Sequence, residues 1–160
     1  MATEKLKFKL ELYATMWDKP PVAEILVSGK SYFKGEITST EDKPTLIEFT
    51  AEIEENTESD FVILRSGKAS GQTIVNKKGD ILKDQTLHIK VMEVDEIDLG
   101  ALVYDGVYTP KYPEPWASQQ RASGEELRES FKNVTQMGFD GEWKFTFSVP
   151  FYMWLLENLY

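Results

Sequence analysis

The sequence predicts an all-β fold, an antiparallel β-sandwich of the jelly-roll kind with one short helix near the C-terminus. Aromatic residues make up 12% of the chain, and such side chains pack well on pleated sheets. Apolar and polar residues alternate with a period of two in several short segments. These segments follow one another at hairpin spacing, which is typical of sandwiches. A length of 160 residues fits a single domain covering residues 1–160.

Alternation defines the predicted strands in the first half of the chain. Residues 6–12 place Leu and Phe side chains on one face and charged side chains on the other. Consecutive prolines then end the strand, because proline cannot donate a ladder hydrogen bond. Residues 22–28 and 32–37 are predicted to pair as a hairpin. Residues 47–53 form the clearest amphipathic strand, with carboxylates on its outer face.

The second half of the chain contains further strands and the one expected helix. The predicted strands are residues 61–65, 86–94, 99–104 and 143–149. A loop rich in Gly, Ser, Lys and Asn covers residues 66–80. Residues 123–132 are predicted to be helical, because Ser123 and Glu126 have the spacing of a capping box and Leu127 and Phe131 lie four apart.

Composition excludes several classes of function. Eighteen Lys and Arg against 27 Asp and Glu give a formal charge of −9, the wrong sign for a nucleic-acid partner. The chain has no Cys and a single His, which removes sulfur-based zinc sites and most imidazole relays. The longest apolar stretch, residues 149–156, contains a proline and is too short to cross a bilayer, so no membrane partner is expected. The N-terminus has no apolar leader, and we expect synthesis in the cytoplasm without a signal peptide.

No motif predicts an enzyme. The pairs Gly29-Lys30 and Gly67-Lys68 lack the earlier glycine of a phosphate loop and the helix that would follow it. His88 points away from its apolar neighbours in a strand, and we expect a solvated or hydrogen-bonded side chain rather than a catalytic base. A pair of carboxylates for glycoside hydrolysis ranks last, since no spacing in the sequence selects one.

Acidic loops are candidates for calcium, which carboxylates and carbonyls can bind without His or Cys. The candidate ligands are Asp95, Asp98 and Asp105, although their spacing is not that of an EF-hand loop. Asp140 was also considered, but Asp140-Gly141 is more simply a hairpin turn.

The most unusual segment is residues 104–116, in which aromatic residues recur at every fourth position among prolines. Two interpretations stay open. Tyr108, Tyr112 and Trp116 could form a recognition surface together with Trp17, because rigid rings suit sugar stacking and protein contacts. Alternatively, the rings fold over the open end of the sandwich and complete the core. The apolar residues 151–160 pose a related choice, since they either complete the core or dock onto a neighbour.

Three parts of the chain carry a resemblance: residues 17–21, residues 112–120 and residues 141–155. Together they resemble virion structural and accessory proteins of tailed marine cyanobacterial phages. Those proteins are similar in fold to the β-sandwiches of carbohydrate-binding modules. The resemblance implies a location in the virion, and other virion proteins or a second copy of the chain as partners. It assigns no functional residue.

Two functions follow as expectations. The first is a non-catalytic phage structural or accessory module that makes protein–protein contacts through its aromatic and C-terminal surfaces. The alternative is a carbohydrate-binding module, with or without calcium, in which the aromatic residues named above form a platform for a glycan.

Overall fold

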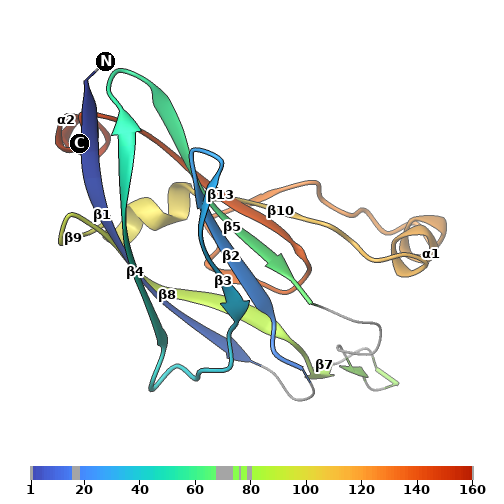
Figure 1. Ribbon diagram of the computed structural model, residues 1–160. Coiled ribbons are helices and arrows are strands. Elements are labelled where there is room, and N and C mark those ends of the chain that lie inside the picture. Colours follow the sequence, from blue (N-terminus) through green and yellow to red (C-terminus); the bar gives the residue numbers. More distant parts are fainter. Residues whose placement is uncertain (1, 16–18, 68–73, 76, 79–80, 160) are drawn as a thin grey trace.

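The computed structural model describes residues 2–15, 19–67, 74–75, 77–78 and 81–159. Its strands form two large antiparallel sheets, which pack face to face as a sandwich (Figure 1). The expected antiparallel β-sandwich is therefore confirmed. Within the described residues, no helix is long and apolar enough to cross a membrane.

The first sheet has the order β12-β8-β1-β4, and β9 pairs with β8. Its strands are β1 (Thr3–Thr15), β4 (Thr45–Glu54), β8 (Thr86–Val94), β9 (Ile97–Asp98) and β12 (Gln136–Met137). The second sheet has the order β11-β10-β13-β5-β2-β3. Its strands are β2 (Val22–Val27), β3 (Lys30–Glu36), β5 (Glu58–Ser66), β10 (Val107–Pro110), β11 (Phe131–Lys132) and β13 (Gly141–Ser148). A small hairpin pairs β6 (Ile74–Val75) with β7 (Ile81–Lys83).

The core between the sheets comes from the inward faces that the alternation predicts. In β1, the side chains of Leu6, Phe8, Leu10 and Leu12 are almost completely buried. Phe8 stacks on Phe61 of the opposite sheet, with ring centroids 5.5 Å apart. Burial of this apolar area is the main source of stability for such a fold.

Residues 99–104 do not form the predicted strand. They form the 3₁₀-helix η1 (Gly100–Asp105), and the backbone N–H of Leu102 donates to the carbonyl of Leu99. The Asp98 carboxylate accepts the N–H of Gly100, whose φ is +54°. These local hydrogen bonds satisfy the backbone within the segment and favour a turn over a strand.

The predicted helix over residues 123–132 is also wrong. The helix α1 (Trp116–Ala122) lies just before it, and Ser123 is its last cap rather than the first cap of a new helix. The Ser123 N–H donates to the Gln119 carbonyl, and Gly124 follows with φ +90°, a conformation typical of helix ends. Pro115 precedes the first turn, where a missing N–H costs nothing.

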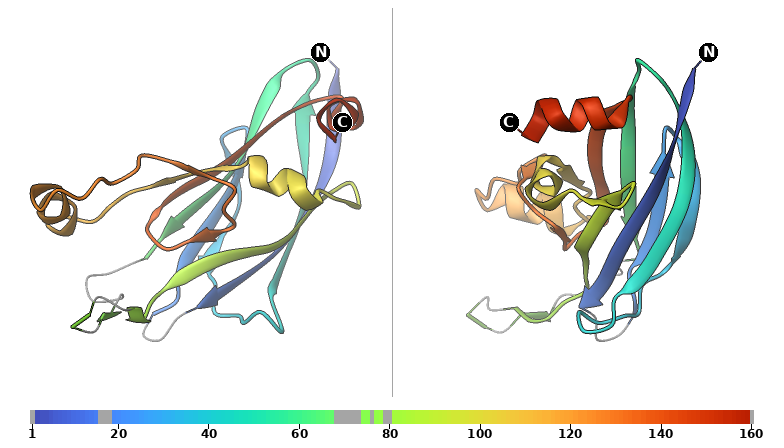
Figure 2. Two further views of the ribbon diagram at one scale, coloured as in Figure 1. Left: turned by 180° about the vertical axis from the view of Figure 1, so that it is seen from behind. Right: turned by 90° about the vertical axis from the view of Figure 1, so that its left-hand side faces the viewer.

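The chain between β10 and β11 projects away from the sandwich. We call residues 111–130 the arm; α1 lies at its far end (Figures 1 and 2). At the other side of the molecule, α2 (Phe151–Leu159) lies next to the N-terminal end of β1 (Figure 2).

The C-terminal helix α2 has one buried face and one open face. Phe151 and Leu155 join the core, and the Phe151 N–H donates to the Glu4 carboxylate at 3.0 Å. Tyr152 and Met153 are exposed. The segment thus contributes to the core, as one of the two interpretations expected, and leaves apolar side chains on the surface.

Candidate functional site

The structure describes three of the four aromatic residues of the predicted platform, and two of them, Tyr112 and Trp116, pack against each other. Trp17 lies outside the described residues. Tyr108 is only 5% exposed, so its ring has no open face and lies inside the molecule rather than on a binding surface. Tyr112 and Trp116 lie together on the arm, with ring centroids 6.0 Å apart. Tyr108 therefore completes the core, which is one of the two interpretations of this segment. Trp116, at 36% exposure, remains accessible to a ligand.

A third ring completes the group on the arm. Phe139 lies just before β13, and its centroid is 5.1 Å from that of Tyr112 and 5.3 Å from that of Trp116. We call Tyr112, Trp116 and Phe139 the arm cluster. The sequence carries no local signal for Phe139, because this residue stands alone beside a hairpin turn and belongs to no periodic pattern.

A cavity of about 380 Å³ opens beside the arm cluster, a volume in the usual range for small-molecule sites. Its apolar lining is Pro110, Tyr112, Ala117 and Leu127. Its polar lining is Thr109, Glu114, Arg121 and Glu129. We call this cavity the arm pocket. It offers hydrogen-bond donors and acceptors on an apolar base, which is the usual make-up of a binding site.

Hydrogen bonds hold the walls of the arm pocket. The Tyr112 hydroxyl donates to the carbonyl of Arg128 at 2.6 Å, and the Ser118 hydroxyl donates to the Glu114 carboxylate. Desolvation raises the pKa of Tyr112, although Arg128 and Arg121 oppose the shift. Tyr112 is therefore neutral near pH 7 and keeps the proton that it donates.

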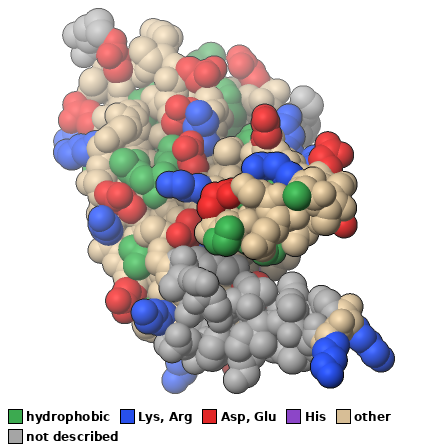
Figure 3. Space-filling model, turned by 90° about the vertical axis from the view of Figure 1, so that its right-hand side faces the viewer, with side chains coloured by type: hydrophobic (Ala, Val, Ile, Leu, Met, Phe, Trp, Pro, Cys, Tyr) green, Lys and Arg blue, Asp and Glu red, His purple; other side chains and the backbone are tan. Residues whose placement is uncertain are grey.

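The charges around the arm are mixed in sign. Figure 3 looks onto the side of the molecule from which the arm projects, and acidic and basic side chains are interspersed over it. Inside the pocket lining, Glu114 and Glu129 outnumber the single cation Arg121. An anionic ligand thus meets a local excess of negative charge in addition to the net charge of −9.

The buried Tyr108 holds the backbone of Phe139, one of the three residues of the arm cluster. Its hydroxyl donates to the carbonyl of Phe139 at 2.5 Å and accepts the Phe139 N–H at 2.9 Å. Burial raises the pKa of Tyr108 to about 12. The neutral phenol can serve as donor and acceptor together, and so it fixes both backbone groups of one residue.

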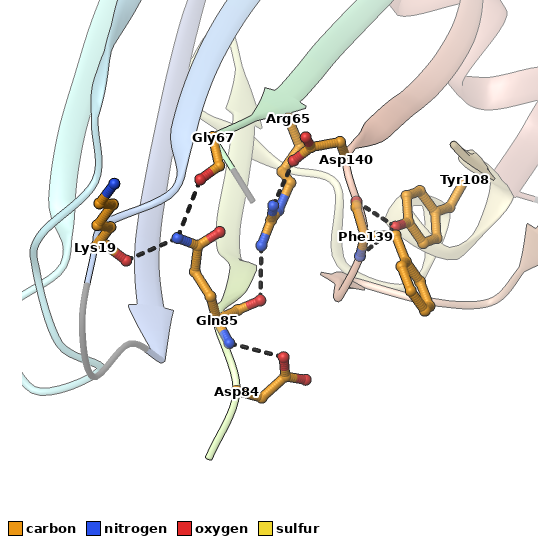
Figure 4. Close-up of polar contacts among 8 residues, drawn as sticks. All are labelled: Lys19, Arg65, Gly67, Asp84, Gln85, Tyr108, Phe139 and Asp140. Carbon is orange, nitrogen blue, oxygen red and sulfur yellow. Dashed lines mark hydrogen bonds and ion pairs between the residues drawn. The ribbon is translucent and has the colours of Figure 1, made fainter. Parts of the chain in front are cut away.

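A buried polar network lies behind Phe139 (Figure 4). Arg65 is 2% exposed and donates from Nη1 to Oδ1 of Asp140 and from Nη2 to the carbonyl of Gln85, both at 2.6 Å. The Gln85 amide donates to the carbonyl of Lys19 at 2.8 Å. The sequence held a signal for this network, because Phe61, Ile63 and Arg65 alternate on one face and a cation at an inward position needs a partner.

The predicted calcium ligands serve local structure. Oδ1 of Asp95 accepts the N–H of Lys7, Oδ1 of Asp98 accepts the N–H of Gly100, and Asp105 lies exposed at the end of η1. Among the described residues, no group of three or more His, Cys, Asp or Glu is placed to hold a metal ion.

His88 lies on the outer face of the first sheet, as its position in the alternation predicts. Its ring stacks on Tyr13 at 4.5 Å between centroids, and Nε2 lies 2.9 Å from the hydroxyl of Thr15. Desolvation lowers the pKa of His88, and the nearby Glu41 partly opposes this shift. His88 is therefore a hydrogen-bonded side chain, as expected from the sequence.

The fold is similar to that of two solved structures, both of carbohydrate-binding modules. One is vCBM60 in complex with galactobiose, with a TM-score of 0.50 and 10% identity over 87% of this chain and 96% of that chain. The other is a selenomethionine form of vCBM60, with a TM-score of 0.51 and 10% identity over 88% of this chain and 89% of that chain. The latter is described in connection with a circular permutation that links two families of calcium-dependent carbohydrate-binding modules.

No protein-family model and no curated protein matches this sequence. At 10% identity the structural likeness establishes the fold alone, a β-sandwich like that of carbohydrate-binding modules.

Proposed function

We propose that this protein is a non-catalytic carbohydrate-binding module that takes an uncharged saccharide in the arm pocket. The observation that carries the proposal is a cavity of about 380 Å³ lined by Tyr112, with the 36% exposed Trp116 ring packed against that tyrosine. The face of an indole ring is negative and attracts the C–H groups on the apolar face of a sugar. Glu114, Arg121 and Glu129 can then accept from and donate to the sugar hydroxyls.

The uncharged class of ligand follows from electrostatics. Two carboxylates and one guanidinium line the pocket, and the chain as a whole carries −9. A uronic acid or sulfated sugar would bring further negative charge into this field, and desolvating it there would be unfavourable. Neutral sugars bring only hydroxyl groups, which suit both signs of pocket charge.

Calcium does not enter this proposal. The similar modules are described as calcium-dependent, but the described carboxylates of this chain do not fit such a site. Oδ1 of Asp95 already accepts the N–H of Lys7 in β1, and Oδ1 of Asp98 already accepts the N–H of Gly100. We therefore expect saccharide binding to be equal in excess calcium and in excess chelator.

The proposal is tested by glycan-array screening followed by calorimetric titration of the best saccharide, with galactobiose included as a probe. We expect Trp116→Ala to weaken binding by at least about tenfold, because an exposed tryptophan beside a pocket is a typical binding hot spot. Tyr152→Ala is the matched control, since Tyr152 is an exposed aromatic residue on α2, away from the arm. An array without any saccharide ligand, or equal loss in both variants, would refute the proposal.

A second candidate is the phage structural or accessory module that the sequence resemblance implies. It is favoured by the open face of α2, where Tyr152, Met153 and Leu156 are 62%, 60% and 46% exposed. Exposed apolar groups of this kind often mark a protein contact. Light scattering of the purified protein tests self-association, and a monomer that binds saccharide would favour the first candidate.

A further inference from the structure

We propose that Arg65 is a positioning residue for the arm pocket, acting through Asp140 and Phe139. The inference rests on the proposed function, because it concerns the site at which the saccharide would bind. Neither Arg65 nor Asp140 lines the pocket. Their effect on binding must therefore pass through the residues between them and the arm cluster.

The first step is the fixed geometry of the cation. The Arg65 side chain comes from β5 and lies in the interior, where an uncompensated charge is costly. Its Nη1 and Nη2 atoms hold Asp140 and the carbonyl of Gln85, each at 2.6 Å. Because one planar group makes both contacts, it fixes Asp140 relative to the start of β8.

The second step joins Asp140 to the arm. The carbonyl of Asp140 accepts the N–H of Lys111 at 2.6 Å, and Lys111 is the first residue of the arm. Phe139, which precedes Asp140 in the chain, is held at its N–H and its carbonyl by the hydroxyl of Tyr108. Arg65 and Tyr108 therefore fix neighbouring residues of one short backbone segment from opposite sides (Figure 4).

The third step is packing. The Phe139 ring contacts Tyr112, which lines the pocket, and Trp116, which precedes the lining residue Ala117. A shift of the Asp140 backbone moves Phe139, and with it the surface against which both rings lie. Small displacements of groups that line a site have large effects on its affinity, because the contacts depend on close fit.

The test uses Asp140→Asn, which keeps the shape of the side chain and removes its charge. Asp60→Asn is the matched control: Asp60 accepts a hydrogen bond from Thr146 across the same pair of strands, β5 and β13, but far from the arm along them. Both proteins are compared with the wild type by calorimetry with galactobiose and by amide hydrogen exchange.

We expect Asp140→Asn to weaken saccharide binding at least about fivefold. It should also speed exchange at the N–H groups of Lys111 and Phe139, while the amides of β1 and β4 keep their wild-type protection. Asp60→Asn should change neither measurement in the arm. Wild-type exchange at Lys111 and Phe139, or equal acceleration in β1 and β4, would overturn the positioning role and leave only a general structural one.

The two proposals fail in different ways. If the wild-type protein binds no saccharide, the proposed function fails, and the exchange rates of Lys111 and Phe139 still decide whether Arg65 positions the arm. If the wild type binds and Asp140→Asn binds equally well, the positioning role fails and the proposed function stands.

Discussion

Two tryptophans show how differently the sandwich and the arm use the same side chain. Trp143 in β13 is completely buried, and it packs edge-on against Phe61 and flat against Phe145. Trp116 in α1 has an exposure of 36%, and its ring lies against those of Tyr112 and Phe139. The first indole stabilises the fold, whereas the second is accessible to a ligand.

The largest expected effect is the loss of stability when the buried tryptophan of the sandwich is truncated. Trp143→Ala should reduce the free energy of unfolding by about 3–5 kcal/mol, since it leaves a large cavity in a close-packed core. Trp116→Ala should cost less, about 1–2 kcal/mol, because its ring is 36% exposed and packs against the arm rather than in the core between the sheets. Urea unfolding, followed by circular dichroism, measures both. Similar losses in the two variants would mean that the arm is part of the core.

The sandwich was predictable because its strands obey a local rule. In β1 the side chains alternate between core and solvent, and the partner strands β4 and β8 pair with it along their lengths. Period-two patterning fixes which face of a strand is buried, whatever the rest of the chain does. The same rule assigned β2, β3, β4, β5, β8 and β13, all of which the structure contains.

The arm could not be predicted in the same way, because tertiary contacts create it. Phe139 joins Tyr112 and Trp116 only after β10 and β13 pair, which brings Thr109 opposite Glu142. The position of Ser123 illustrates the limit of local signals: a capping-box sequence is present, yet the serine ends a helix. The sequence predicts a platform of Trp17, Tyr108, Tyr112 and Trp116, but Phe139 and the pocket depend on chain segments far apart in sequence.

Tyr108, which joins the sandwich to Phe139 of the arm cluster, should give a second and smaller effect, a dependence of stability on pH. Its pKa is raised from 10.0 to about 12 in the folded protein, whereas the unfolded chain ionises near 10.0. The stabilisation is complete below pH 10 and is lost as the pH rises through the folded pKa, a loss of about 2 kcal/mol. The measurement is the midpoint of urea unfolding between pH 9 and 11.5. Tyr108→Phe lacks the ionising group, so its difference from the wild type should shrink over this range; a constant difference would contradict the assignment.

The smallest expected effect lies on the outer face of the first sheet. His88 is the one histidine of the chain, so its ring signals in a proton NMR spectrum can be followed without assignment. Its pKa is lowered from 6.5, chiefly by desolvation against Tyr13 and its neighbours. The unfolded chain therefore takes up the proton first, and stability that is present above pH 6.5 declines as the pH falls through the folded pKa. Glu41 favours the charged ring, so Glu41→Gln should lower the titration midpoint further. A rise in the variant would contradict the role of Glu41, and a wild-type midpoint above 6.5 would show that burial is not the dominant cause.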